Sequence, residues 1–237
     1  MNNTINSIFI ILICLTSCNN DATNYNQEAI KRIKNGKYQE ALIFTHKGLK
    51  EDSYYTPLYY NRAIALANIG KYKDALELLD YVIKDNINFY DAYLNRGIIF
   101  ENNKDYIRAT KDYSYAINLV PSNKKAYLYR GIVRLKNKDI NGAIFDFSQA
   151  INNKLNSTSV YFNRGLAYYL INNYKKALND FNHAISIDPS SANSYLYRGI
   201  IYNKLNNKTK AVKELNLAAN YGSNKANQLL KTINKWH

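Results

Sequence analysis

The sequence predicts an all-α protein built from stacked helical hairpins, and three observations support this prediction. A tyrosine recurs every 34 residues, small residues recur at fixed distances behind it, and only 3 prolines and 9 glycines occur in 237 residues. So few turn-forming residues argue against a loop-rich β protein. With 46% hydrophobic residues the chain can bury a core throughout, and no Ser/Gly-rich or Pro-rich linker divides it. We therefore expect one continuous architecture.

Three series of residues with a common period of 34 define the repeat. The tyrosines are Tyr25, Tyr59, Tyr93, Tyr127, Tyr161 and Tyr195. The small residues four positions later are Ala29, Ala63, Gly97, Gly131, Gly165 and Gly199. The alanines sixteen positions after each tyrosine are Ala41, Ala75, Ala109, Ala143, Ala177 and Ala211. Small side chains at both positions allow two amphipathic helices to approach closely, so each unit is predicted to be a helical hairpin.

Turn residues lie where this period requires them. Between the paired helices stand Asn35-Gly36, Ile69-Gly70, Asn102-Asn103-Lys104, Asn137-Lys138, Asn172-Asn173 and Asn206-Asn207. Glycine or asparagine there is expected to adopt the left-handed conformation that ends a helix. Thr56 is predicted to cap a helix that has Pro57 in its first position. Pro121 and Pro189 stand where a second helix must stop.

These residues together resemble the tetratricopeptide repeat family, and the match covers residues 22 to about 225. The resemblance implies a right-handed superhelical solenoid of six hairpins plus a C-terminal capping helix. The predicted repeats are 22–55, 56–89, 90–123, 124–157, 158–191 and 192–225, followed by the capping helix at 226–237. The first repeat departs from the pattern, because Arg32 and Thr45 replace core residues.

The N-terminus carries an apolar run from Ile8 to Leu15, which is too short to cross a bilayer because a spanning helix needs about 20 residues. It suits the centre of a signal peptide, and residues 15–18 resemble the lipobox of bacterial lipoproteins. This implies a signal peptide at 1–17, lipid on Cys18 and a tether at 18–24. Residues 1–7 lack the usual lysine or arginine, so an ordinary signal peptide or a buried apolar strand remain alternatives.

A ladder of ion pairs is predicted along the stack. Arginine precedes the small residue of the first helix in five units, and an acidic residue follows sixteen positions later in four of them. The predicted partners are Arg96, Arg130, Arg164 and Arg198 with Asp112, Asp146, Asp180 and Glu214. A guanidinium group can meet each carboxylate with two hydrogen bonds. A basic binding stripe formed by the same arginines is the alternative.

The family resemblance implies that a ligand lies in a concave groove lined by the first helix of each repeat. The lining positions are Tyr60, Ile64, Leu94, Ile98, Leu128, Ile132, Phe162, Leu166, Leu196 and Ile200. An exposed apolar strip marks a protein contact, so a helix or peptide of another protein is the predicted partner. Tighter coiling that buries the strip is the alternative. The predicted polar rim is Asn68, Asn102, Lys136 and Lys204.

Catalytic groups are hard to assemble from this sequence. The histidines His46, His183 and His237 are far apart in a linear stack, no His/Cys metal spacing occurs, and no glycine-rich phosphate loop follows a strand. We therefore predict no enzyme, metal, cofactor or small-molecule substrate. The tyrosines could form a stacking platform for nucleic acid, but the resemblance implies that they are core residues, so no nucleic acid is expected.

The leading functional prediction is a non-catalytic interaction scaffold, attached by lipid to a membrane of the bacterial cell envelope. A lipobox followed by six repeats looks like the lipoproteins that assist assembly of envelope complexes. The chain has 32 Lys and Arg against 18 Asp and Glu, which favours acidic partners or reflects a compositional bias. A binder of anionic envelope polymer and a regulatory subunit of an envelope enzyme are the alternatives. The identity of the membrane and of the partner stays open.

Overall fold

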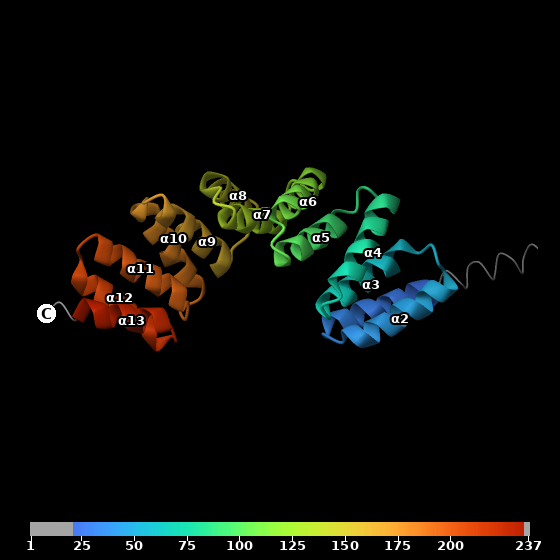
Figure 1. Ribbon diagram of the computed structural model, residues 1–237, viewed down its shortest axis with the longest axis horizontal. Coiled ribbons are helices and arrows are strands. Elements are labelled where there is room, and N and C mark those ends of the chain that lie inside the picture. Colours follow the sequence, from blue (N-terminus) through green and yellow to red (C-terminus); the bar gives the residue numbers. More distant parts are fainter. Residues whose placement is uncertain (1–20, 235–237) are drawn as a thin grey trace, which may run out of the picture. The chain divides into compact units, whose positions relative to one another are not determined.

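The computed structural model of the chain describes residues 21–234, and all of its regular structure is α-helical (Figure 1). No strand occurs within this range, so the predicted all-α fold is confirmed. The proposed signal peptide, Cys18 and part of the tether lie outside the described residues, as does the end of the predicted capping helix from residue 235 on.

The chain divides into two compact units between Asp105 and Tyr106. Unit 1 contains a helix at residues 21–34, α2 (Tyr38–Glu51), α3 (Thr56–Asn68), α4 (Tyr72–Asp85) and α5 (Tyr90–Asn102). Contacts join α2 to α3, α3 to α4 and α4 to α5. Leu66, Leu79, Val82 and Ile99 form one core between these helices.

Unit 2 contains the remaining helices. They are α6 (Tyr106–Leu119), α7 (Lys124–Lys136), α8 (Ile140–Asn152), α9 (Thr158–Leu170), α10 (Tyr174–Ile187), α11 (Ala192–Lys204), α12 (Lys208–Asn220) and α13 (Asn224–Asn234). Helices α7 and α8, α9 and α10, and α11 and α12 pack in pairs (Figure 1). The boundary between the two units lies inside the predicted third repeat, because α5 belongs to unit 1 and α6 to unit 2.

Helix starts follow the 34-residue period. Helices α3, α5, α7, α9 and α11 begin at Thr56, Tyr90, Lys124, Thr158 and Ala192, which are the first residues of the second to sixth predicted repeats. Two details of the sequence analysis were wrong. Thr56 is the first helical residue rather than the cap, and its hydroxyl donates to Asp85. The last helix starts at Asn224 instead of residue 226, because Ser223 accepts a hydrogen bond from the amide of Ala226 at its N-terminus.

The turns inside the repeats place one residue every 34 positions in the left-handed region. The residues and their φ angles are Gly36 (71°), Gly70 (82°), Lys104 (61°), Lys138 (64°), Asn172 (58°) and Asn206 (58°). The expectation of glycine or asparagine was therefore wrong for two turns, where lysine adopts this conformation and the preceding asparagine does not. A side chain with a Cβ atom is strained there by roughly 1 kcal/mol.

Glycine in the first helix is required by the packing of the second helix. A Cβ atom at Gly131 would lie 2.7 Å from the ring of Phe147, and one at Gly165 would lie 2.9 Å from the ring of Phe181. Both phenylalanine side chains are fully buried. The small residues of the 34-residue period thus make room for the aromatic core of the same hairpin.

Candidate functional site

The apolar strip predicted to line a groove is largely used inside the stack. Leu94 and Leu196 are buried, with 7% and 3% of their surfaces exposed, and the other eight predicted residues are partly buried. Leu128 and Ile132 of α7 pack against a core formed by α8 and α9, and Ile200 packs against the core of α11 to α13. None of the ten is fully exposed. The strip therefore offers a partner only its outer edges.

Two of the strip residues are fixed by the following repeat. The amide of Asn95 donates to the Tyr60 hydroxyl at 2.9 Å, and the Tyr60 ring lies 4.9 Å from the ring of Phe89. Burial raises the pKa of Tyr60. The ring of Phe162 lies 5.8 Å from that of Tyr197. The Tyr60–Asn95 and Phe162–Tyr197 contacts each join residues that are 35 positions apart. The 34-residue period does not predict this register.

A cavity of about 230 Å³ in unit 1 brings four of the predicted residues together. It is lined by the strip residues Ile64 and Ile98 and the rim residues Asn68 and Asn102, with Asn95 beside them. The Asn68 amide donates to the backbone oxygen of Ile64 at 2.8 Å. Asn102 is exposed. Apolar walls with amide edges suit an apolar side chain whose flanking peptide groups form hydrogen bonds.

The two predicted rim residues of unit 2 lie at helix ends. Lys136 and Lys204 are the last residues of α7 and α11, and both are exposed. A positive charge in the last turn of a helix is favoured by the helix dipole. The helix dipole is thus one reason for their position, and their predicted role at a rim stays a prediction.

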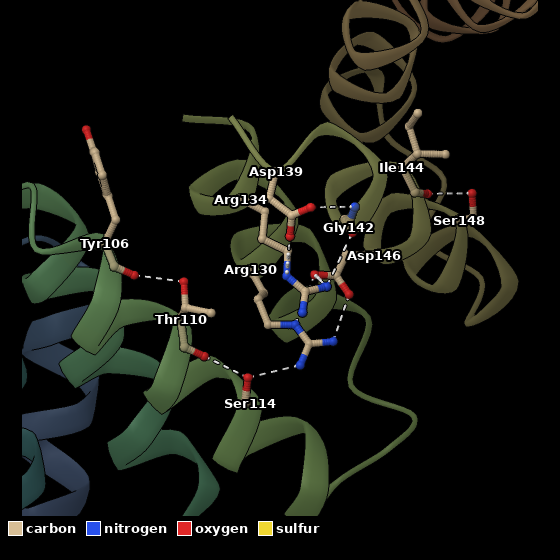
Figure 2. A network of polar contacts seen from close by, with 10 residues as sticks. All are labelled: Tyr106, Thr110, Ser114, Arg130, Arg134, Asp139, Gly142, Ile144, Asp146 and Ser148. Atoms are coloured by element: carbon tan, nitrogen blue, oxygen red, sulfur yellow. Dashed lines mark hydrogen bonds and ion pairs between the residues drawn. The ribbon is translucent and has the colours of Figure 1, made fainter. Parts of the chain in front are cut away.

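Buried ion pairs connect the two helices of the hairpins in unit 2. The fully buried carboxylate of Asp146 accepts hydrogen bonds from Arg130 Nε at 2.9 Å and Nη2 at 2.7 Å, and from Arg134 Nη1 at 2.9 Å (Figure 2). Arg164 binds Asp180 with the same two-bond geometry, at 2.8 and 2.7 Å. Burial opposes the charge of Arg164, but the hydrogen bonds and attraction of Asp180 outweigh it and raise its pKa.

The last hairpin has Glu214 where the three preceding hairpins have aspartate, and its ion pair has a poorer geometry. Arg198 Nη2 donates to Glu214, whereas Arg198 Nε and the second carboxylate oxygen of Glu214 are buried without a hydrogen-bond partner in the described part of the chain. One extra methylene group therefore replaces the two-bond contact with a single bond. The expected pairing of Arg96 with Asp112 stays a prediction.

Arg130, Arg164 and Arg198 each bind a second partner sixteen residues before them, and Arg96 has a partner at the same distance; none of these contacts was predicted from the sequence. Arg130 Nη1 donates to the Ser114 hydroxyl at 3.0 Å, as Figure 2 shows. The other pairs are Arg96 with Asp80 at 2.6 Å, Arg164 with Ser148 at 3.3 Å and Arg198 with Asn182 at 3.0 Å. The second partners themselves recur every 34 residues, so the period contained a signal for them. Arg130, Arg164 and Arg198 thus connect the second helices of successive repeats.

The repeated tyrosines lie against the same arginines. The Cζ atoms of Arg96, Arg130, Arg164 and Arg198 lie 5.6 to 5.9 Å from the ring centres of Tyr93, Tyr127, Tyr161 and Tyr195. Of these four tyrosines only Tyr93 is buried, and the others are partly buried. His183 stacks on Tyr161, with 5.1 Å between the ring centres. Each tyrosine ring is thus engaged by a cation of its own helix.

Within residues 21–234, no group of three or more His, Cys, Asp or Glu residues is placed to hold a metal ion. None of the helices described there combines the length and the apolar character that a membrane crossing requires.

Comparisons with known proteins agree with the helical repeats. Two family models, both described as tetratricopeptide repeat, match residues 60–123 and residues 158–191. The chain therefore contains tetratricopeptide repeats, a fold that generally serves protein–protein interaction and is typically non-catalytic. No curated protein matches the chain.

Several solved structures share the fold at low sequence identity. One, described as "Functional Characterization of Pseudomonas Aeruginosa pilF", is 18% identical, with 91% of this chain and 99% of that chain covered and a TM-score of 0.80. YrrB, described as "a TPR protein with an unusual peptide-binding site", is 21% identical over 79% of this chain and 97% of its own, with a TM-score of 0.69. MamA from Desulfovibrio magneticus RS-1 is 20% identical, with 72% of this chain and 97% of that chain covered and a TM-score of 0.64.

Proposed function

We propose that the chain is a non-catalytic scaffold that holds a segment of a partner protein along the first helices of its repeats. The observation that carries this proposal is the cavity of unit 1, in which Ile64 and Ile98 supply apolar walls and Asn68 and Asn102 supply the edge. A partner helix or extended segment would place an apolar side chain between the two isoleucines. The amides of the asparagines would then meet peptide groups beside it.

The partly buried state of the strip sets the strength of such binding. Because most of its apolar surface is already in contact within the repeats, little further area can be buried by a partner. We therefore propose a contact with a few anchoring side chains rather than a helix lying in a deep groove. The structure of YrrB, described as having an unusual peptide-binding site, supports peptide binding by this fold.

We further propose that lipid on Cys18 anchors the scaffold to a membrane of the bacterial envelope, where it assists assembly of an envelope complex. The support is the sequence, in which an apolar run ends in Leu15-Thr16-Ser17-Cys18. Labelled palmitate and detergent phase partition test this proposal in the native host. The wild-type protein should carry label and enter the detergent phase, and Cys18→Ser should lose both. Label retained by the variant would exclude Cys18 as the site.

Crosslinked pull-down from native envelopes tests the scaffold proposal. Replacing Ile64 and Ile98 with aspartate puts charge into the cavity, so the crosslinked partner should be lost. Ile43→Asp is the matched control, because Ile43 lies on α2 of the same unit and is 55% exposed. Equal recovery of the partner by the cavity variant and the control would exclude the cavity as the binding site.

A further inference from the structure

The positive charge of the chain is confined to one of its two units. Residues 1–105 contain 12 Lys and Arg and 12 Asp and Glu, whereas residues 106–237 contain 20 and 6. The whole formal net charge of +14 therefore belongs to the second part of the sequence. Lys and Arg number 12 among 105 residues and 20 among 132, so the difference in net charge comes mainly from the acidic residues, which fall from 12 to 6. The scarcity of acidic residues in unit 2 favours a negatively charged ligand there.

The acidic residues of unit 2 do little to offset its positive charge at the surface. Asp146, Asp180 and Glu214 are buried, and each binds an arginine. Asp139 accepts a hydrogen bond from the amide of Gly142 and lies 3.5 Å from Arg134, and Asp188 binds the hydroxyl and the amide of Ser190. Each of these five carboxyl groups thus has a partner within the protein, although one oxygen of Glu214 is left without a hydrogen bond from any described residue and the Asp139 side chain is 51% exposed. The exposed lysines therefore set the charge that a ligand meets.

A cavity of about 890 Å³ lies among α9, α10 and α11 of unit 2. Its lining includes Arg164 and Tyr168 of α9, Lys175, Lys176 and Asn179 of α10, and Tyr202 of α11. None of the ten residues of the predicted groove lines it. Its volume is within the range of binding sites that hold ligands of several residues or rings. The cavity is thus distinct from the apolar strip.

Among residues 21–234, two of the positively charged side chains in this cavity have no carboxylate partner. Arg164 is satisfied, because its guanidinium binds Asp180 and the Ser148 hydroxyl. Lys175 and Lys176 are exposed, and neither has a carboxylate within ion-pair distance in the described part of the chain. Two adjacent ammonium groups attract anions and can each donate up to three hydrogen bonds.

The tyrosines hold cations rather than offering free rings. Lys176 Nζ lies 5.3 Å from the ring centre of Tyr168, and Arg164 Cζ lies 5.9 Å from the same ring. Lys210 Nζ lies 5.4 Å from the ring centre of Tyr202. The cation–π contact with Tyr168 restrains the Lys176 ammonium group at the cavity wall. Ring stacking, which recognition of nucleobases and sugars uses, competes with these contacts.

We propose that this cavity binds an acidic peptide segment. Neighbouring aspartate or glutamate side chains would accept hydrogen bonds from Lys175 and Lys176, and the Asn179 amide would meet the peptide backbone. A peptide fits better than a nucleic acid or a polysaccharide, because its carboxylates need the ammonium groups alone, whereas bases and sugar rings need the tyrosine faces. The site goes beyond the proposed scaffold function, because it uses none of the residues of the unit 1 cavity.

Fluorescence anisotropy with a labelled octaglutamate peptide tests the proposal on the chain from residue 19 on. The variant replaces Lys175 and Lys176 with alanine. The control replaces Lys71 and Lys73, two exposed lysines of unit 1, and removes the same charge. Lys73 lies three periods of 34 residues before Lys175. The cavity variant should bind about tenfold more weakly at low salt, and the control less than twofold, with thermal unfolding unchanged in both.

Equal loss in the two variants would show general charge attraction and overturn the proposal, as would binding of octaglutamate that neither variant changes. Heparin and vesicles containing phosphatidylglycerol are the competing probes. If binding of heparin or of the vesicles depends on Lys175 and Lys176 while octaglutamate fails to bind, the cavity binds an anionic polymer or a lipid surface instead, and the proposal is wrong. Octaglutamate binding should be unchanged when Ile64 and Ile98 are replaced with aspartate. The two proposals can therefore fail independently of each other.

Discussion

Arg130 on α7 donates two hydrogen bonds to the fully buried carboxylate of Asp146 on α8, and Arg134 of the same helix α7 donates a third. The pair lies at the centre of the polar network in Figure 2. A buried carboxylate that is held by two cations balances their charge. Removing it leaves guanidinium groups that are largely shielded from water.

Asp146→Asn should therefore lower the free energy of unfolding by about 3 kcal/mol. Glu40→Gln is the control, because Glu40 pairs with Arg32 in the first repeat but is 44% exposed. An exposed pair is worth about 0 to 1 kcal/mol. Urea unfolding followed by circular dichroism measures both. Similar small losses in the two variants would show that burial of Asp146 does not set the strength of its ion pairs.

Gly131→Ala should destabilise the protein by roughly 1 to 3 kcal/mol, because the new Cβ atom would lie 2.7 Å from the ring of Phe147. The sign of the change in stability is diagnostic, because replacing glycine with alanine in an unhindered helix stabilises it by about 1 kcal/mol. Phe147→Leu should remove most of the penalty in the double variant, although it opens space by itself. Thermal unfolding of the four proteins of this cycle gives the coupling directly, and additive effects would contradict the contact.

Lys138→Gly should raise the free energy of unfolding by up to about 1 kcal/mol, because Lys138 has a φ angle of 64°. Lys138→Ala removes the same charge but retains the Cβ atom, so it should give no comparable gain. Chemical denaturation of both variants separates the backbone effect from the charge effect. A gain shared by the two would assign it to charge.

Tyr60→Phe should make the protein less sensitive to alkaline pH. Burial raises the pKa of Tyr60, so the folded state keeps a neutral phenol where the unfolded chain ionises, near pH 10. The contribution of this group to stability is therefore intact below about pH 10 and is lost as the pH rises further. Melting temperatures from pH 8 to 12 should fall less steeply in the variant. Tyr54→Phe is the control, because 85% of the surface of Tyr54 is exposed; a change of the pH profile as large as that of Tyr60→Phe would contradict a role for burial.

The 34-residue period was sufficient to predict the helices, because the small residues and tyrosines that produce it are those that pack the hairpins. It also placed Arg130 and Asp146 on facing helices. The period did not reveal that Tyr60 and Phe162 contact the next repeat, because burial of an apolar residue depends on the rotation between repeats. The left-handed lysines were missed for a related reason, since hydrogen bonding and packing around a turn can outweigh the preference of its central residue.

The arginine contacts determine how the stack can come apart. Arg164 binds Asp180 of its own hairpin and Ser148 of the hairpin before it, and Arg198 makes the corresponding contacts with Glu214 and Asn182. A hairpin that detaches from the C-terminal end must therefore break bonds in the repeat it leaves behind. Unravelling of this region should proceed by whole hairpins, and amide hydrogens of α9 to α12 should exchange in blocks that each span a repeat.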